Sequence, residues 1–176
     1  AKMGKRAISV RWIDTNKGDQ VNPNLRSRLV GRELNLSKQD GLFAGTPPLE
    51  SLRYILSMRA SRPGNRVMAI DIKRAYFYAP ATRPIYVEIP AEDRAHDDSD
   101  KVGALNLSLY GTRDAAVNWV RAYTKVLKTA GFIVGRHCAQ NFWHPHREVA
   151  VTVHGDDFTS TGSEEQLLWL KGVLGK

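Results

Sequence analysis

The chain has 176 residues, of which 42% are hydrophobic and four are tryptophan, and its formal net charge is +8. This length and apolar content are typical of one domain with a buried core and exclude intrinsic disorder. The single cysteine, Cys138, excludes an intrachain disulfide framework and indicates a reducing, intracellular compartment. No apolar run approaches the roughly 18 residues that a membrane-spanning helix needs.

The positive charge is confined to the first third of the chain. Residues 1–66 hold 13 basic and 5 acidic side chains, whereas residues 67–176 hold 13 of each. A basic end of this kind is typical of a protein with an anionic partner. Charge alone leaves that partner open among nucleic acid, a nucleotide and a membrane surface.

A basic hairpin is predicted near the N-terminal end. Residues 8–13 favour a strand, residues 14–19 a turn-rich loop with Lys17 near its tip, and residues 26–36 the returning strand. The excess of arginine and lysine in this stretch predicts that the hairpin carries much of the positive charge.

A helix is predicted to follow the hairpin. Thr46 is a residue type that caps helices, and Pro47 would lie in the first turn, where a missing N–H costs nothing. Four apolar side chains at helical spacing would form one stripe: Leu49, Leu52, Ile55 and Leu56. Pro63 and Gly64 would end the helix.

Strands and helices alternate in the remainder of the chain. The expected elements are a strand at 66–72, a strand at 85–89, a helix from Asp114 to about Ala130 that stops at Gly131, a hairpin at 149–161 and a helix after the capping-box residues 163–166. Strands joined partly by hairpins and interspersed with helices predict an α+β fold.

Three aspartates are candidates for catalysis. Asp71 ends an apolar strand, and Asp156 and Asp157 lie in the turn of the predicted hairpin. Carboxylates at the ends of core strands are costly unless they are solvated, hydrogen-bonded or paired with a metal. If all three converge, they suit two Mg²⁺ ions and phosphoryl transfer. Unrelated aspartates would give the same pattern, because turns are rich in Asp and Gly.

Four segments stand in a specific order along the chain. They are Arg26-Ser-Arg-Leu-Val-Gly-Arg32, Val67-Met-Ala-Ile-Asp-Ile-Lys-Arg-Ala-Tyr-Phe77, Leu107-Ser-Leu-Tyr-Gly-Thr-Arg-Asp-Ala-Ala-Val-Asn-Trp119 and Val153-His-Gly-Asp-Asp157. In this order they resemble a fingers strand, the first aspartate motif, the Ser-Leu-Tyr-Gly motif and the Tyr-x-Asp-Asp hairpin of copia-type retrotransposon reverse transcriptases. The order is far more specific than any one motif.

The resemblance implies a role for each matching residue. It places two Mg²⁺ ions, with Mn²⁺ as a substitute, on Asp71, Asp156, Asp157 and the carbonyl oxygen of Ile72. Tyr76 would pack under the sugar and exclude a 2′-OH, which favours deoxynucleotides. The other residues implied to bind the nucleotide are Lys17, Arg28, the main-chain N–H groups near Arg74 and Ala75, Tyr110 and Gly111.

The resemblance also implies the fingers and palm of a right-hand polymerase. The fingers would take about residues 1–46 and 80–113, and the palm about residues 47–79 and 114–176, with an antiparallel palm sheet backed by helices. A thumb and any RNase H domain would lie beyond Lys176. The implied activity is RNA-directed DNA synthesis on a template-primer from deoxynucleoside triphosphates, in the cytoplasm or a virus-like particle.

Departures from the family pattern leave catalysis open. His154 and Gly155 stand where the family usually has Tyr-Val, which removes a group expected near the primer end and is expected to loosen the turn. Asp114 and Ala116 replace the usual Gln and Pro. The alternative function is that of a catalytically inactive, truncated remnant that binds nucleic acid or serves as a structural subunit of a larger complex.

Overall fold

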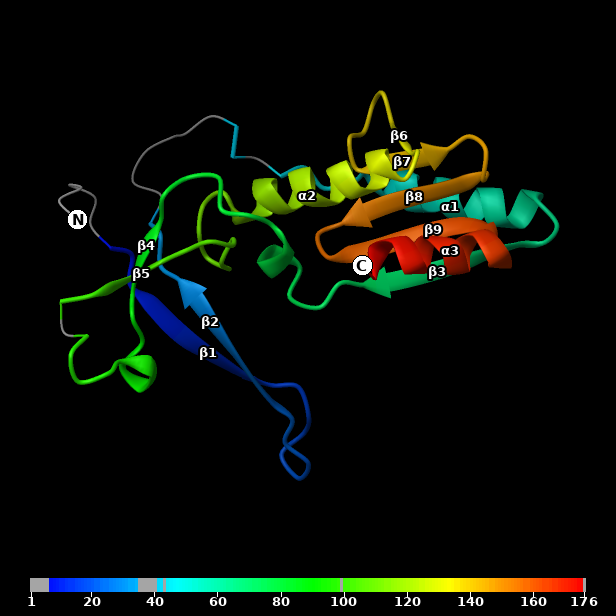
Figure 1. The fold of residues 1–176 in the computed structure, drawn as a ribbon. Coiled ribbons are helices and arrows are strands. Elements are labelled where there is room, and N and C mark those ends of the chain that lie inside the picture. The colour runs from blue at the N-terminus through cyan, green and yellow to red at the C-terminus, as the bar shows by residue number, and fades with distance from the viewer. Residues whose placement is uncertain (1–6, 35–40, 43, 99, 176) are drawn as a thin grey trace. The chain divides into compact units, whose positions relative to one another are not determined.

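Two units, each built from two separate stretches of the chain, make up the fold (Figure 1). In this computed structural model, residues 7–34, 41–42, 44–98 and 100–175 are described. Unit 1 comprises Ala1–Leu42 and Tyr76–Trp119, and unit 2 comprises Phe43–Ala75 and Val120–Lys176. No helix in the described part of the chain is long and apolar enough to cross a membrane.

A five-stranded antiparallel sheet forms the centre of unit 2. Its strands are β3 (Asn65–Asp71), β6 (Ile133–Val134), β7 (Asn141–His144), β8 (Val149–His154) and β9 (Asp157–Ser163). Their order across the sheet is β3-β9-β8-β7-β6, and every neighbouring pair is antiparallel. Five of the six residues of β8 are buried, because this strand lies in the middle of the sheet.

Helices cover both faces of this sheet, and the strand register shows which face each one contacts. Ile55 and Met58 of α1 (Leu49–Ser61) pack with Ala150 and Trp143, which are paired across β8 and β7. Alternate residues of a strand point to opposite faces. The preceding residue of β7, Phe142, therefore lies on the other face.

The other face is covered by α2 (Ala115–Thr129) and α3 (Glu164–Leu174). Tyr123 of α2 makes edge-to-face contacts with Phe142 and Phe158, whose ring centroids lie 6.0 and 5.6 Å away. Trp169 of α3 contacts His144, which lies on the same face as Phe142. In Figure 1, α1 and α3 accordingly lie behind and in front of the sheet.

The predicted start of the first helix is wrong, and of its predicted apolar stripe only Ile55 is buried. The N-cap is Pro48 rather than Thr46, and no side chain caps the helix, so Pro47 lies before the first turn. The buried residues are Ser51, Ile55 and Met58, which are spaced i, i+4, i+7. Leu49, Leu52 and Leu56 are 57%, 38% and 50% exposed because they lie on other sides of the helix.

The predicted stop of the second helix is confirmed. Gly131 has a φ of +98°, in the left-handed region that favours glycine. The Gly131 N–H donates to the carbonyl oxygen of Lys128, and the Phe132 N–H donates to that of Leu127. These two bonds form a Schellman motif, and buried Phe132 and Leu127 seal it with apolar contact.

Unit 1 contains two small antiparallel sheets. One pairs β1 (Val10–Asn16) with β2 (Leu25–Gly31), and the other pairs β4 (Tyr86–Glu88) with β5 (Val102–Ala104). Two short 3₁₀ helices, Ala75–Tyr78 and Ala91–Asp93, complete the elements, the first crossing the boundary between the units. The core of unit 1 is small and is formed by Ile85, Val87 and Leu109, with Ile8, Val10 and Leu105 packed against it.

The mixture of helices and antiparallel sheets confirms the α+β prediction. The basic hairpin is also confirmed, although β1 continues to Asn16, through residues predicted to be a loop, and β2 ends at Gly31. The predicted strand at 66–72 and hairpin at 149–161 correspond to β3, β8 and β9 with small shifts at the ends.

Candidate functional site

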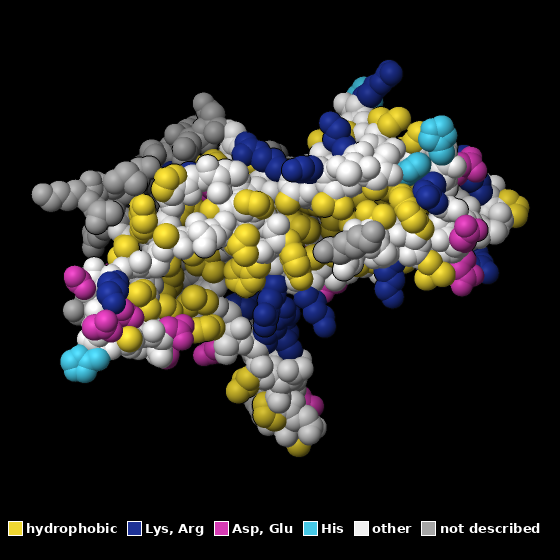
Figure 2. Space-filling model, viewed as in Figure 1, with side chains coloured by type: hydrophobic (Ala, Val, Ile, Leu, Met, Phe, Trp, Pro, Cys, Tyr) yellow, Lys and Arg dark blue, Asp and Glu magenta, His cyan; other side chains and the backbone are white. Residues whose placement is uncertain are grey.

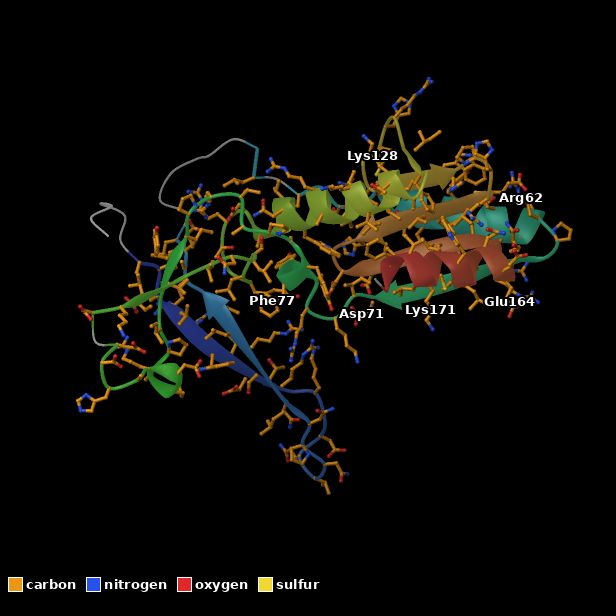
Figure 3. All side chains as sticks on the ribbon, in the orientation of Figure 1. Arg62, Asp71, Phe77, Lys128, Glu164 and Lys171 are labelled. Atoms are coloured by element: carbon orange, nitrogen blue, oxygen red, sulfur yellow. The ribbon has the colours of Figure 1, made fainter. Side chains whose placement is uncertain are left out.

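The candidate carboxylates of unit 2 lie at one end of the sheet. Asp71, labelled in Figure 3, is the last residue of β3. It is paired directly with Asp157, the first residue of β9. The two side chains therefore point to the same face, with Cβ atoms about 4.5–5.5 Å apart. Both residues are exposed, as is Asp156 in the adjoining turn. The turn holds Asp156 beside β3, because the Ile72 N–H donates to the Asp156 carbonyl oxygen at 3.0 Å.

The turn that carries Asp156 is a tight two-residue hairpin. His154 pairs with Asp157, so Gly155 and Asp156 are its central residues. Gly155 has a φ of +64°, whereas Asp156 has no positive φ. A glycine with positive φ at the first central position is the signature of a type II′ turn, whose twist suits a hairpin. Gly155 therefore meets a backbone requirement of this turn.

The donor set at this end of the sheet fits a divalent metal. Like charges directly opposite on neighbouring strands are destabilising, and a cation between Asp71 and Asp157 would remove that repulsion. Carboxylate and carbonyl oxygens are the ligands that Mg²⁺ prefers. Among the described residues, however, no group of three or more His, Cys, Asp or Glu side chains is arranged as a ready metal site. The structure brings Asp71 and Asp157 together without gathering all three carboxylates into one cluster.

The residues that follow Asp71 have an unusual backbone. Arg74 has a φ of +58°, one of two positive values at non-glycine residues of the described chain. Such a conformation costs of order 1–3 kcal/mol and is concentrated at functional sites. Arg74 is exposed, whereas the next residue, Ala75, is fully buried.

The hairpin of unit 1 has one basic face. Arg11, Arg26 and Arg28 lie on the same face, because they pair with Val30, Thr15 and Ile13 and side chains alternate along each strand. The bond from the Lys17 N–H to the Asn24 carbonyl oxygen continues this register, so Lys17 belongs to the same face. This face carries no carboxylate from Val10–Asn16 or Leu25–Gly31.

The opposite face of the hairpin is apolar and acidic. It carries Trp12, Asp14, Leu25 and Leu29, of which Trp12 is 46% and Leu25 is 72% exposed. Hydrophobic side chains are visible toward the tip of the hairpin in Figure 2. The two faces therefore differ in charge, and only the basic face suits an anion.

Aromatic rings gather beside the basic face of the hairpin in unit 1. The Tyr76 and Tyr110 ring centroids lie 4.4 Å apart, and Phe77 meets Tyr110 edge-on at 5.8 Å. The Arg28 guanidinium lies 5.8 Å from the centre of the Tyr110 ring. Three of the residues predicted to bind nucleotide, Arg28, Tyr76 and Tyr110, are thus brought together. Lys17 lies further along the hairpin, at its loop.

The backbone at position 111 requires glycine, which the sequence alone did not reveal. Its φ is +82°, and a Cβ atom on it would lie 2.0 Å from the carbonyl oxygen of Gly31. The Gly31 N–H also donates to the Tyr110 carbonyl oxygen at 2.7 Å. Only glycine permits this approach of the Tyr110–Gly111 segment to β2. Gly111 therefore fixes the aromatic ring of Tyr110 relative to the hairpin.

A partly buried polar network holds the same segment, and the sequence did not predict it. Arg83 forms ion pairs with Glu33, just beyond β2, and with Asp114, just before α2. Glu33 also accepts the Arg113 N–H at 2.8 Å, and Asp114 accepts a hydrogen bond from Asn118 at 3.1 Å. Burial lowers the pKa of the Arg83 guanidinium, but the bonds to Glu33 and Asp114 outweigh it, so its pKa is raised. The only sequence signal was Asp114 in place of the usual Gln.

Comparisons with known proteins identify the family of this chain. The family model described as "Reverse transcriptase (RNA-dependent DNA polymerase)" matches residues 2–173. The "Retrovirus-related Pol polyprotein from transposon TNT 1-94" of Nicotiana tabacum is 27% identical over 188 residues, which covers 98% of this chain and 14% of that polyprotein. The chain belongs to the reverse transcriptase family and is of the copia retrotransposon type.

Proposed function

We propose that the chain supplies the fingers and palm of an RNA-directed DNA polymerase. In this assignment unit 1 is the fingers and unit 2 is the palm. The observation that carries the proposal is the direct pairing of Asp71 with Asp157 at the end of an antiparallel sheet. Family membership supports the proposal, because both aspartates lie within the residues that the family model matches.

The metal-binding part of the proposal rests on unit 2. Asp71, Asp156, Asp157 and the carbonyl oxygen of Ile72 would hold two Mg²⁺ ions. When bound, such ions make a hydroxyl a better nucleophile and neutralise charge on a triphosphate. The sheet register fixes two of these ligands before any metal arrives, which lowers the cost of ordering them.

The nucleotide-binding part rests on unit 1. Lys17 and Arg28 would neutralise the negative charge of a triphosphate, while Tyr76 and Tyr110 would offer ring faces to the sugar and base. The primer 3′-OH would attack the α-phosphate and release pyrophosphate. The hairpin cations would then act by positioning and charge stabilisation, which are the main contributions of protein groups in phosphoryl transfer.

Primer extension on an RNA template tests the proposal, with Mg²⁺ or Mn²⁺ and the four deoxynucleoside triphosphates. Asp71→Asn, Asp156→Asn and Asp157→Asn should each reduce extension by about 10²–10³-fold, the usual loss for one electrostatic group at a reacting centre. Asp97→Asn, in the exposed acidic loop, is the matched control and should extend like the wild type.

Two results would contradict the proposal. Extension that survives in all three variants would exclude these aspartates as metal ligands. A wild-type chain that binds template-primer but never extends it would favour the alternative of a nucleic-acid-binding module without catalysis.

A further inference from the structure

A hollow on the outer side of α2 in unit 2 stands apart from the site described above. It has a volume of about 520 Å³ and is bordered by the C-terminal half of α2 and by Val134 of β6. The polar groups at its wall are those of Arg121, Thr124, Lys125, Lys128 and Thr129. No carboxylate lines it. Figure 2 shows dark-blue side chains along the edge of the molecule over α2, and Figure 3 labels Lys128 there.

The three cations follow one line along the helix. Arg121, Lys125 and Lys128 are spaced i, i+4, i+7, so they share one side of α2. With a rise of 1.5 Å per residue they span about 10 Å. Tyr123 and Leu127, 3% and 0% exposed, occupy the opposite side and pack into unit 2. The helix therefore places three cations along one edge of the hollow, beside the apolar side chains of Val120, Val134 and Ala139.

This row has no partner within the part of the chain that the structure describes. None of the three cations forms an ion pair there, whereas Arg53, Arg62, Arg83 and Lys101 each face a carboxylate. Like charges at i, i+4 destabilise a helix by a few tenths of a kcal/mol. Total charge along the sequence conceals the row, because the acidic side chains of residues 67–176 lie elsewhere.

The shape of the hollow indicates which anion it suits. A row of cations about 10 Å long matches successive phosphates along a strand better than one compact triphosphate. Thr124 and Thr129 supply hydroxyl groups beside the charges, and no aromatic side chain lines the hollow. Contacts of this kind fix a strand by its backbone and do not read its bases.

We propose that the α2 hollow binds the phosphodiester backbone of single-stranded nucleic acid. The hollow lies on the side of the sheet covered by α2, whereas Asp71 and Asp157 point to the other face. This strand contact goes beyond the proposed polymerase function and does not require catalysis. It provides a second place at which a template or product strand is held.

The test measures binding of a fluorescein-labelled, 20-nucleotide oligo(A) RNA by anisotropy between 50 and 200 mM salt. The triple variant Arg121→Gln, Lys125→Gln, Lys128→Gln should bind at least tenfold more weakly at low salt. Its slope of log affinity against log salt should fall by about 2, since each phosphate contact of a single strand contributes about 0.7. The charge-preserving variant Lys125→Arg, Lys128→Arg should keep the wild-type slope, provided that its melting temperature shows it is folded.

The matched control removes the same charge from cations that face carboxylates. The triple variant Arg53→Gln, Arg94→Gln, Lys101→Gln should leave the slope within about 0.5 of the wild type, because exposed pairs of this kind contribute little. Equal slopes for the two triple variants, or an unchanged slope in the α2 variant, would overturn the proposal.

Two competitors distinguish other anions. Inorganic triphosphate that displaces the oligonucleotide as effectively as unlabelled oligo(A), at equal phosphate concentration, would assign the hollow to a compact anion and overturn the proposal. Loss of binding to phosphatidylserine vesicles in the α2 variant, with its RNA slope unchanged, would assign it to a membrane. Asp156→Asn should keep the wild-type slope, so failure of the catalytic proposal and failure of this one are separable.

Discussion

In unit 2, Asp71 and Asp157 are fixed by the hydrogen-bond register of a five-stranded sheet, whereas in unit 1 Arg28 is carried on a two-stranded hairpin with few buried residues. A two-stranded hairpin is marginally stable by itself. The base of this hairpin is instead held by Gly31 against Tyr110 and by Glu33 against Arg83. Changes in unit 1 should therefore alter positioning and binding, and changes at the aspartates should alter chemistry.

Breaking the polar network at the base of the hairpin should have the largest effect on stability. Arg83→Ala leaves the carboxylates of Glu33 and Asp114 without their cation, and Asp114 has a side chain only 6% exposed. We expect a loss of about 2–3 kcal/mol in unfolding free energy, which is below the value for a fully buried pair because Arg83 is one-third exposed.

Urea unfolding and hydrogen exchange at the Gly31 amide measure this loss. Lys101→Ala, which removes an exposed cation facing Asp97 and Asp98, is the control and should cost much less, because water screens an exposed ion pair. If the two variants lose the same stability, Arg83 does not anchor the hairpin.

Removing the hairpin cations should weaken nucleotide binding. Lys17→Ala and Arg28→Ala should each reduce affinity for a deoxynucleoside triphosphate by about tenfold, as expected for the loss of one charge-assisted bond. Calorimetric titration measures the affinity. Arg121→Ala and Lys128→Ala are the controls, and they should affect strand binding but leave nucleotide affinity within twofold of the wild type. If all four substitutions lower the nucleotide affinity equally, the basic face of the hairpin is a nonspecific basic surface.

Alanine at Gly155 and at Gly172 should have smaller and opposite effects on stability. Gly155→Ala should destabilise the protein by about 1 kcal/mol, because its φ of +64° is unfavourable for alanine although no atom lies within 4 Å of the added Cβ. Gly172→Ala, in α3 and equally open, should instead stabilise by about 0.5–1 kcal/mol. Thermal melts of the two variants should shift in opposite directions. A stabilising Gly155→Ala would exclude the type II′ turn.

The last comparison concerns the core of unit 2, where an effect is expected only at alkaline pH. Burial raises the pKa of Tyr123 to about 12, above its value of about 10 in the unfolded chain. The folded state then holds the proton more tightly between these values, so the stabilisation is complete below pH 10 and is lost as the pH rises toward 12. Tyr123→Phe should lose stability less steeply over this range in chemical denaturation. The exposed Tyr54→Phe should follow the wild type, and identical slopes for Tyr123→Phe would contradict the assignment.

Local pattern was sufficient for most of the fold. Gly131 marks the end of α2 because a left-handed cap is a requirement of the backbone, and alternation in residues 149–153 identifies a buried strand. The apolar stripe of α1 was misread, since three leucines at helical spacing lie on its exposed sides while Ser51 is buried through a hydrogen bond from Asn141. That choice depends on β7, which lies 90 residues away along the chain.

The candidate site was also only partly predictable from local sequence. Asp71 and Asp157 are recognisable from motifs, but their direct pairing depends on the register between β3 and β9. The strand register places the basic side chains of the hairpin on one face. A count of charges in the sequence shows that the hairpin is positive but not which face carries the charge. The bonds from Arg83 to Glu33 and Asp114 join residues up to 50 positions apart, and no local pattern reports them.

The most direct test of the central claim is anomalous diffraction from crystals grown with Mn²⁺ and a non-hydrolysable deoxynucleoside triphosphate. We predict anomalous peaks about 2.0–2.3 Å from carboxylate oxygens of both Asp71 and Asp157, with a second ion beside the triphosphate. A structure in which the nucleotide is ordered while Mn²⁺ is bound away from these two aspartates would contradict the claim.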